Sequence, residues 1–229
     1  GIDKLLTILK NAEKKLIDTH KSIDSVPYNG LSESYLERIY INSDGANRYM
    51  KLSQSSIYLY AKAQEKNRKP RSAGGIRINS NLEQLDINSC IEEISNKLIS
   101  HLNYKAIETK KYLICFSPEA FLQLISAFSS MFNARSIIDG LSLMNEESIG
   151  NQIAVKNLNI SDEGLHPENV GAFSFDGEGT PTQNINLIKS GVLTNLIHSE
   201  ATARKFGVKP TGHAGLGAKV SVSTDWLVI

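Results

Sequence analysis

Apolar residues recur at helical spacing at the start of the chain and again before its midpoint. Residues 2–17 carry an apolar residue every three or four positions, which predicts a helix ending near the turn-like sequence Ser-Val-Pro-Tyr-Asn-Gly at 25–30. A second stripe of this kind runs from Ile87 to Leu102, and Asp86 directly before it is suited to capping a helix. Each segment is therefore expected to bury one face in a core.

Between these two helices the pattern changes to short runs that are typical of strands. Strands are predicted over 36–42, 49–52 and 56–63, and the last of them alternates apolar and polar residues at Ile57 and Leu59. A small sheet with two helices forms an α/β layer that can close a core of its own.

A third apolar stripe begins after residue 117. A strand is predicted over 111–116, and Ser117 and Pro118 then form a favourable cap and first residue for a helix. The apolar residues of this helix have the spacing of ordinary core packing, at Phe121, Leu124, Ile125 and Phe128. Beyond about residue 110, strands separated by Gly, Asn and Asp turns become more frequent.

These patterns predict an α+β fold with two regions. Residues 1–110 are expected to be part of an amino-terminal α/β domain, with helices on a small sheet, and residues 111–229 part of a strand-rich carboxy-terminal domain. The chain begins at Gly1 and ends in an apolar run from Trp226 to Ile229. We therefore expect a fragment of a longer chain.

Composition agrees with a folded protein and says little about chemistry. The chain has 229 residues, of which 41% are apolar and 21% charged, and no apolar run approaches the roughly 18 residues needed to span a bilayer. No apolar segment of the secretory kind opens the sequence, so a cytoplasmic location without a membrane partner is expected. Cys90 on a helix stripe and Cys115 within a predicted strand are each expected to be small buried hydrophobes rather than halves of a disulfide.

The most specific pattern in the chain begins at Phe173. An acidic, glycine-rich turn at 176–179, Asp-Gly-Glu-Gly, leads into a strand predicted over 184–188. A short turn containing Gly191, which can adopt a positive φ, connects this strand to a returning strand over 192–197.

The same pattern ends at His213. Ser199 is expected to cap a short helix that Gly207 ends, and Thr-Gly-His follows at 211–213. The order of acidic turn, hairpin, capped helix and Thr-Gly-His resembles the central signature of the TldD/PmbA family, whose members are similar to halves of a two-subunit zinc metalloprotease. The resemblance implies that this region lies near a shared active-site channel. It makes five residues candidates for lining a substrate channel, with His213 the favoured histidine: Asp176, Glu178, Gly179, Thr211 and His213.

The metal-binding half of such a protease is recognised by one helix. In the TldD type, a helix upstream of the signature carries His-Glu-x-x-x-His, which supplies two zinc ligands and a glutamate that activates water. The equivalent helix here follows Pro118 and contains no His, no Cys and no carboxylate after Glu119. The chain therefore resembles the PmbA type, also called TldE. The resemblance implies no cofactor and no catalytic residue in this chain, with zinc held only by a TldD-like partner.

Two acidic segments allow more than one interpretation. Asp176 and Glu178 could converge as a general acid–base pair, or each could accept backbone N–H groups that fix the turn. Asp162 and Glu163, with His166 shortly after them, could offer ligands to a metal, but a hydrated turn is the favoured interpretation, because these residues have no fixed helical or strand spacing.

Six basic residues lie close together, and older names in the family refer to DNA gyrase. The net charge of the chain is only +1, and no aromatic residue interrupts the cluster to stack on bases, so nucleic acid is disfavoured as a partner. We interpret the cluster as a solvent-facing loop between strands. Its members are Lys62, Lys66, Arg68, Lys69, Arg71 and Arg77.

Two classes of function follow from the sequence and the resemblance. The first is a non-metal subunit that shapes a proteolytic chamber for peptides or unfolded proteins, paired as a dimer with a TldD-like chain or with itself. The second is a non-catalytic regulatory or binding protein of the gyrase-modulator type. The helix without metal ligands argues against autonomous catalysis and does not choose between these classes.

Overall fold

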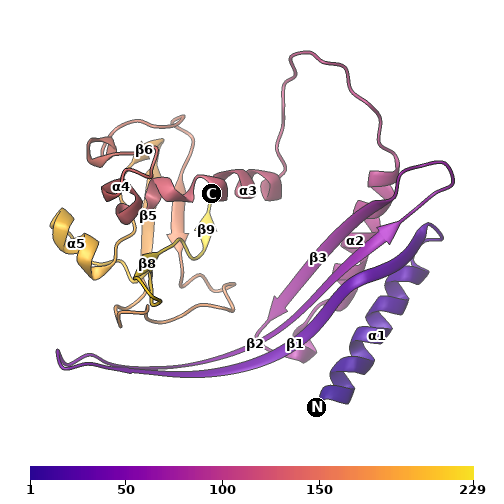
Figure 1. The fold of residues 1–229 in the computed structure, drawn as a ribbon, viewed down its shortest axis with the longest axis horizontal. Helices are drawn as coiled ribbons and strands as arrows, with labels where there is room; N and C mark the ends of the chain where they lie inside the picture. Colours follow the sequence, from indigo (N-terminus) through magenta and orange to yellow (C-terminus); the bar gives the residue numbers. More distant parts are fainter. The chain divides into compact units, whose positions relative to one another are not determined.

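The computed structural model describes residues 1–229 as two compact units (Figure 1). The first unit comprises residues 1–36 and 51–111, and the second comprises residues 37–50 and 112–229. Helices and antiparallel sheets occur in both units. This composition confirms the predicted α+β class.

The first unit is built on a three-stranded sheet in the order β1-β2-β3. Its strands are β1 (Ile23–Ile41), β2 (Asn47–Ala63) and the shorter β3 (Arg71–Asn79), which pairs antiparallel with β2. The tip of the β1–β2 hairpin, residues 37–50, belongs to the second unit. These two strands thus supply residues to both units.

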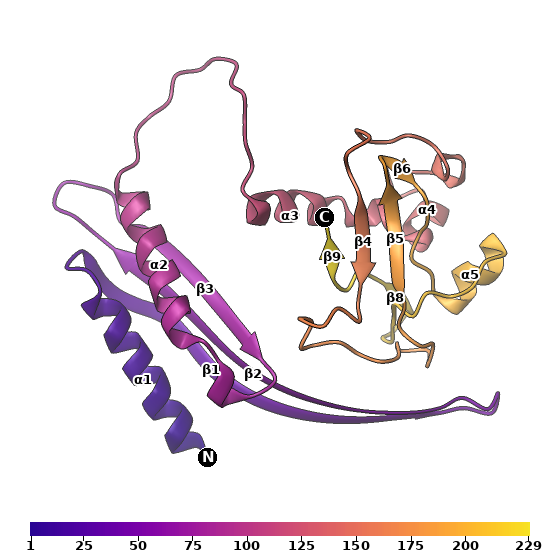
Figure 2. The same ribbon diagram turned by 180° about the vertical axis from the view of Figure 1, so that it is seen from behind.

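Helices α1 (Ile2–Asp18) and α2 (Ile87–Leu102) cover one face of this sheet, as the reverse view in Figure 2 shows. Alternate residues of β2 are buried on that face together with the apolar stripes of both helices. Asp86 caps α2 as predicted, since its Oδ1 accepts a hydrogen bond from the Ser89 amide at 3.0 Å. A short 3₁₀ turn, η1 (Leu82–Gln84), precedes that cap.

One prediction for this unit was wrong, and two others were right only in part. Residues 25–30 continue β1 instead of forming a turn, because Val26 is buried in the core and Pro27 lies on an edge strand, where a missing N–H is tolerated. The loop predicted for the basic cluster is confirmed for Lys66, Arg68 and Lys69, which are exposed between β2 and β3. Lys62, Arg71 and Arg77 instead lie in those two strands. The three short strands predicted at 36–63 are parts of the two long strands β1 and β2.

The second unit contains a four-stranded sheet in the order β6-β5-β4-β9 and a small two-stranded sheet. Helices and 3₁₀ turns surround a core that includes Phe132, Leu187 and Ile197. The strands are β4 (Ile160–Glu163), β5 (Asn184–Lys189), β6 (Val192–Leu193), β9 (Leu227–Val228) and the pair β7 (Ala214–Gly215) and β8 (Ser221–Val222). The helices are α3 (Pro118–Ala127), α4 (Ala134–Ile138) and α5 (Glu200–Phe206), with 3₁₀ turns η2 (Ser129–Phe132) and η3 (Glu146–Ser148).

The hairpin and capped helix predicted after the acidic turn are confirmed in outline. Gly191 has a φ of +77° between β5 and β6, and Ser199 caps α5, which ends at Gly207 with a φ of +67°. Strand β6 is shorter than predicted. It stops before Thr194, whose hydroxyl donates to the Asn186 carbonyl at 2.8 Å.

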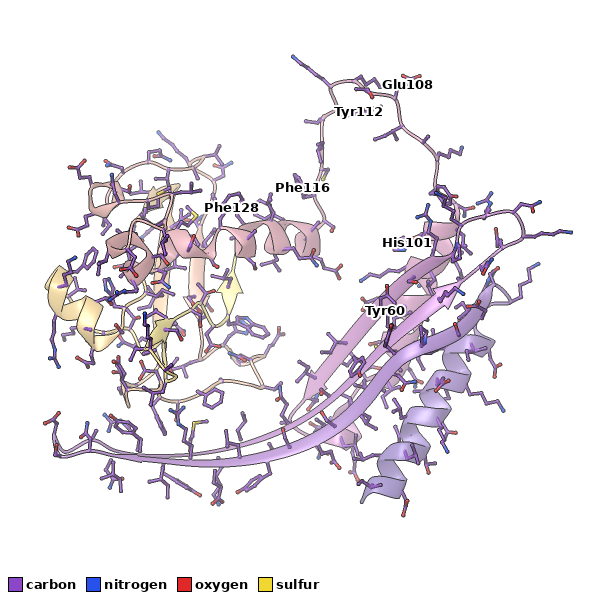
Figure 3. All side chains as sticks on the ribbon, viewed as in Figure 1. Tyr60, His101, Glu108, Tyr112, Phe116 and Phe128 are labelled. Carbon is purple, nitrogen blue, oxygen red and sulfur yellow. The ribbon has the colours of Figure 1, made fainter.

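The segment before α3 differs most from the prediction. Residues 111–116 form no strand, and Leu113 is 102% exposed, because no neighbouring strand pairs with this segment. Figure 3 shows the side chains of Tyr112 and Phe116 projecting from it. Cys115 is therefore exposed, contrary to prediction, whereas Cys90 is buried as predicted.

Helix α3 itself begins at Pro118 under the predicted Ser117 cap, with Ser117 Oγ accepting from the Ala120 amide at 3.3 Å. None of its residues is fully buried, and only Ile125 of the predicted stripe packs against the core of the unit. The prediction of a core-facing stripe was therefore largely wrong. No helix of the protein combines the length and the apolar character required to traverse a bilayer.

Candidate functional site

The acidic turn is organised around the buried carboxylate of Asp176. Its Oδ1 accepts hydrogen bonds from the backbone amides of Glu178 and Thr180, both at 2.9 Å, and its Oδ2 accepts from the amide of Ala214 at 2.9 Å. Two bonds close the turn, and the third joins it to β7, directly after His213. The bond from the Ala214 amide to Asp176 spans 38 positions of the sequence, so Asp176 connects the two ends of the signature segment.

Glu178 has a different partner. Its Oε2 accepts a hydrogen bond from the backbone amide of Glu200, the first residue of α5, at 2.8 Å. The first amides of a helix have no partner within the helix, so a carboxylate there satisfies a donor and interacts favourably with the helix dipole. Both carboxylates of the turn therefore accept backbone N–H groups.

The backbone of the acidic turn is held by the tip of the β1–β2 hairpin. Arg38 Nη2 donates to the Asp176 carbonyl at 3.1 Å, and Arg48 Nε donates to the Gly179 carbonyl at 3.3 Å. Gly179 has a φ of +80°, and the ring of Tyr40 occupies the space that a Cβ would need there. The sequence signature does not include these hairpin residues.

Thr211 and His213 belong to a second buried network. The Thr211 hydroxyl lies 3.0 Å from His213 Nδ1 and accepts a hydrogen bond from the His198 amide at 2.8 Å. On the other side of the ring, His213 Nε2 lies 3.4 Å from Asp162 Oδ2. The exposed fractions of these two side chains are 1% and 0%. The imidazole of His213 thus lies between a hydroxyl and a carboxylate, and its Nε2 has no hydrogen-bond partner.

Asp162 is a further functional candidate, which the sequence pattern assigned to a hydrated turn. It lies in strand β4 rather than in a hydrated turn, and its carboxylate accepts hydrogen bonds from the amides of Asp225 and Trp226 at 2.9 and 2.8 Å. Burial raises the pKa of Asp162, but the nearby His213 and these two amides outweigh burial and hold it below its usual value. Residues 160–163 contain only one apolar residue, Ile160, so no alternating apolar pattern marked Asp162; burial alternates along β4 in the structure and places Asp162 on the buried face.

The neighbouring residues of the sequence Asp-Glu-Gly-Leu-His do not gather around a metal. His166 stacks on the ring of Trp226 with centroids 5.8 Å apart, and its Nδ1 accepts from the Glu168 amide at 3.2 Å. No group of three or more His, Cys, Asp or Glu side chains in residues 1–229 has the arrangement of a metal site.

His198 is the other buried imidazole of this region. It is 5% exposed, its Nδ1 has no hydrogen-bond partner, and its ring meets the Phe206 ring edge-on at 5.1 Å. Burial lowers the pKa of His198, so the neutral form is favoured.

The five predicted channel residues line three separate cavities of the second unit. Asp176 and His213 line a cavity of about 430 Å³ together with Arg38. The guanidinium carbon of Arg38 lies over the rings of Phe175 and Phe173, at 5.1 and 5.9 Å from their centroids. Glu178 and Gly179 border a larger cleft of about 710 Å³.

Thr211 contributes to the third cavity, of about 280 Å³, together with His198. The hydrogen bonds of Asp176 and Thr211 connect the walls of the three cavities. The first cavity also contains Asp225, whose pKa is raised by loss of water around the carboxyl and by the charge of Asp162.

Helix α3 lacks the ligand residues of the zinc-binding helix found in the TldD type. Zinc sites take their ligands from His, Cys, Asp and Glu, and the only such residue of α3 is Glu119, in its first turn. Two ligands on one face of this helix are therefore lacking.

Family comparisons agree with the fold and with the signature. The family model of the PmbA/TldA metallopeptidase central domain matches residues 1–102, and that of the C-terminal domain matches residues 109–229. The chain belongs to the PmbA/TldD family.

Two curated relatives match most of this PmbA/TldD chain. A protein named metalloprotease from Methanothermobacter thermautotrophicus is 28% identical over 213 residues, which are 89% of this chain and 46% of the relative. The metalloprotease PmbA of Escherichia coli O157:H7 is 23% identical over 93% of this chain and 47% of its own length. The chain thus spans about half the length of the curated relatives that it matches.

Solved structures show the same fold. A protein from Thermotoga maritima, described as a modulator of a DNA gyrase, superposes with a TM-score of 0.89 at 25% identity and covers 99% of this chain and 51% of its own. TldE from Thermococcus kodakarensis superposes with a TM-score of 0.80 at 18% identity, covering 99% of this chain and 52% of its own, which supports the fold alone.

Proposed function

We propose that this PmbA/TldD chain belongs to a PmbA/TldE-type subunit that carries no metal and shapes the chamber of a two-chain zinc protease. Its substrates are peptides or unfolded proteins, and a TldD-like partner supplies the zinc. Membership of the family and relatives named metalloproteases support a proteolytic setting.

One observation carries this proposal. The signature segment is held in a single arrangement by the bonds of Asp176 and by the buried His213–Asp162 pair, whereas α3, the helix expected to carry zinc, offers only Glu119. A protein with an ordered channel wall and no electrophile contributes to hydrolysis through another chain. The cavity beside His213 and Arg38 is the surface that we assign to substrate.

Co-expression of the full-length protein with a TldD-like chain tests the proposal. We expect cleavage of an unfolded protein only when both chains are present, and none when the first histidine of the partner's His-Glu-x-x-x-His is replaced by alanine. Cleavage by this protein alone, or by the partner alone at an equal rate, would contradict the proposal. Sedimentation should show a dimer, and we expect its interface to bury at least about 1,200 Å².

A regulatory protein without a proteolytic role is the alternative function. The description of the Thermotoga maritima relative as a modulator of a DNA gyrase is the observation that favours it. In the first unit, however, Lys62 and Arg77 of the basic cluster are engaged with Asp24 and Glu93 at 3.2 and 2.6 Å, which leaves less charge for nucleic acid. A monomer that neither associates with the partner nor supports cleavage would favour this alternative.

A further inference from the structure

A cavity in the first unit has a lining that the channel proposal does not use. It has a volume of about 570 Å³ and lies where β3 begins, beside the end of α2. The lining contains a guanidinium, an imidazole and four hydroxyl groups but no carboxylate, and its residues are Tyr60, Arg71, Ser72, Ser100, His101 and Tyr104, with Pro70 beside them. Figure 3 labels Tyr60 on β2 and His101 in the last turn of α2, so both the sheet and the helix contribute to it.

Arg71 is the charged centre of this cavity. Its guanidinium carbon lies 3.7 Å from the centroid of the Tyr104 ring, and its Nε is shielded from solvent without a hydrogen-bond partner. No carboxylate of the protein forms an ion pair with it. A guanidinium held over the face of an aromatic ring keeps its remaining donors oriented, which favours recognition of a planar or tetrahedral oxyanion.

The other arginines nearby are already engaged. Arg68 donates to the Leu102 carbonyl at the end of α2 and lies 3.7 Å from Glu65, and Arg77 forms an ion pair with Glu93 at 2.6 Å. Arg71 thus differs from its neighbours because its charge is not neutralised within the protein.

We propose that this cavity binds a small organic anion, with the oxyanion group on Arg71 and a flat body against the tyrosine rings. A phosphate or a carboxylate group satisfies the fork of donors equally well in geometry, and the hydroxyl of Ser72 offers a further hydrogen bond. The volume falls in the range of small-molecule sites. This site is independent of the proposed proteolytic role.

Calorimetric titration of the protein with phenyl phosphate, benzoate and inorganic phosphate tests the proposal. We expect saturable one-to-one binding of at least one of the two aromatic anions, weaker binding of inorganic phosphate, and attenuation by added salt. Arg71→Gln should weaken binding by about tenfold or more, because charge-assisted hydrogen bonds are lost. Which of the two aromatic anions binds more tightly distinguishes a phosphate from a carboxylate ligand.

Lys69→Gln is the matched control, because this lysine belongs to the same basic cluster but does not line the cavity. It should change the affinity less than about twofold. Amide NMR shifts of the unsubstituted protein provide a second measurement that needs no variant. They should move at Ser72, Ser100 and Tyr104 and stay unchanged at residues 64–69. Absence of saturable binding, an equal loss in Lys69→Gln, or shifts confined to residues 64–69 would each overturn the proposal.

Discussion

At the scale of single residues, the acidic turn depends on Gly179, a position where any side chain would lack space. We predict that Gly179→Ala lowers the free energy of unfolding by more than about 1 kcal/mol, since alanine is strained at a φ of +80° and its methyl group would overlap the Tyr40 ring. Urea denaturation measures the change.

Gly207 provides the control for this substitution. It has a φ of +67° at the end of α5, but no atom lies within 4 Å of the position of its Cβ. Gly207→Ala therefore tests the backbone strain alone and should destabilise the protein less than Gly179→Ala. Equal losses would show that the Tyr40 ring moves aside, and no loss at Gly179 would contradict the description of the turn.

The stability of the fold should depend on the carboxylate of Asp162, which provides two acceptor oxygens in a buried position. Its carboxylate accepts two backbone amides and lies beside His213, whereas an asparagine has one acceptor oxygen and turns its NH₂ group toward one of these donors. We predict that Asp162→Asn destabilises the protein by about 1–3 kcal/mol, because a buried donor loses its partner. Asp139→Asn removes an ion pair to Arg135 at the surface and should change stability by less than about 1 kcal/mol. A similar effect of the two substitutions on chemical denaturation would show that burial of Asp162 is not decisive.

The buried His198 predicts a dependence of stability on pH. Burial lowers its pKa in the folded protein below the ordinary value of 6.5, so the unfolded chain binds more protons once the pH falls below 6.5. The stabilisation associated with neutral His198 is therefore complete above 6.5 and is lost as the pH falls toward the folded-state pKa. One such group contributes a slope of at most about 1.4 kcal/mol per pH unit.

Urea unfolding at several pH values between about 8 and about 5.5 measures this slope, which His198→Gln should reduce. The slope near pH 8 should be the same in both proteins, because His198 does not titrate there in either state. An unchanged slope below 6.5 in the variant would assign the pH dependence to other groups.

At the scale of elements, helices were predictable and strand pairing was not. The caps Asp86, Ser117 and Ser199 and the apolar periodicity behind them are local signals, and α2, α3 and α5 begin where those signals place them. Whether a run of apolar residues becomes a strand depends on a partner elsewhere in the chain. β3 acquires a partner in β2, whereas the more apolar segment 111–116 pairs with no strand.

That segment also carries a prediction. Leu113 and Ile114 are 102% and 66% exposed, so replacing both with glutamine removes apolar surface without opening a cavity. We expect Leu113→Gln/Ile114→Gln to reduce self-association in light scattering and to change the free energy of unfolding by less than about 0.5 kcal/mol per substitution. Leu187→Gln, at a fully buried position of β5, should destabilise strongly by comparison. A large loss of stability in the double variant would mean that these side chains are buried in solution.

At the scale of the whole molecule, the candidate site combines residues that no local pattern connects. The bonds from Arg38 and Arg48 to the acidic turn span 138 and 131 positions of the sequence, and the bonds of Asp162 to the Asp225 and Trp226 amides span 63 and 64. The signature identified the turn and Thr-Gly-His because those residues are contiguous. It could not identify the arginines or Asp162, since their roles arise only when distant segments pack together.

The absence of zinc ligands from α3 gives the last prediction. Elemental analysis of the protein purified without chelators should find no stoichiometric zinc, because α3 offers only Glu119 and no other cluster of three ligand side chains has the arrangement of a metal site in residues 1–229. A complex with a TldD-like chain should contain about one zinc, held by the partner's two histidines. Replacing the first of those histidines with alanine should remove the metal and leave the complex intact on sedimentation. About one zinc per chain in this protein alone would contradict the assignment of the metal to the partner, and with it the division of roles between the two chains.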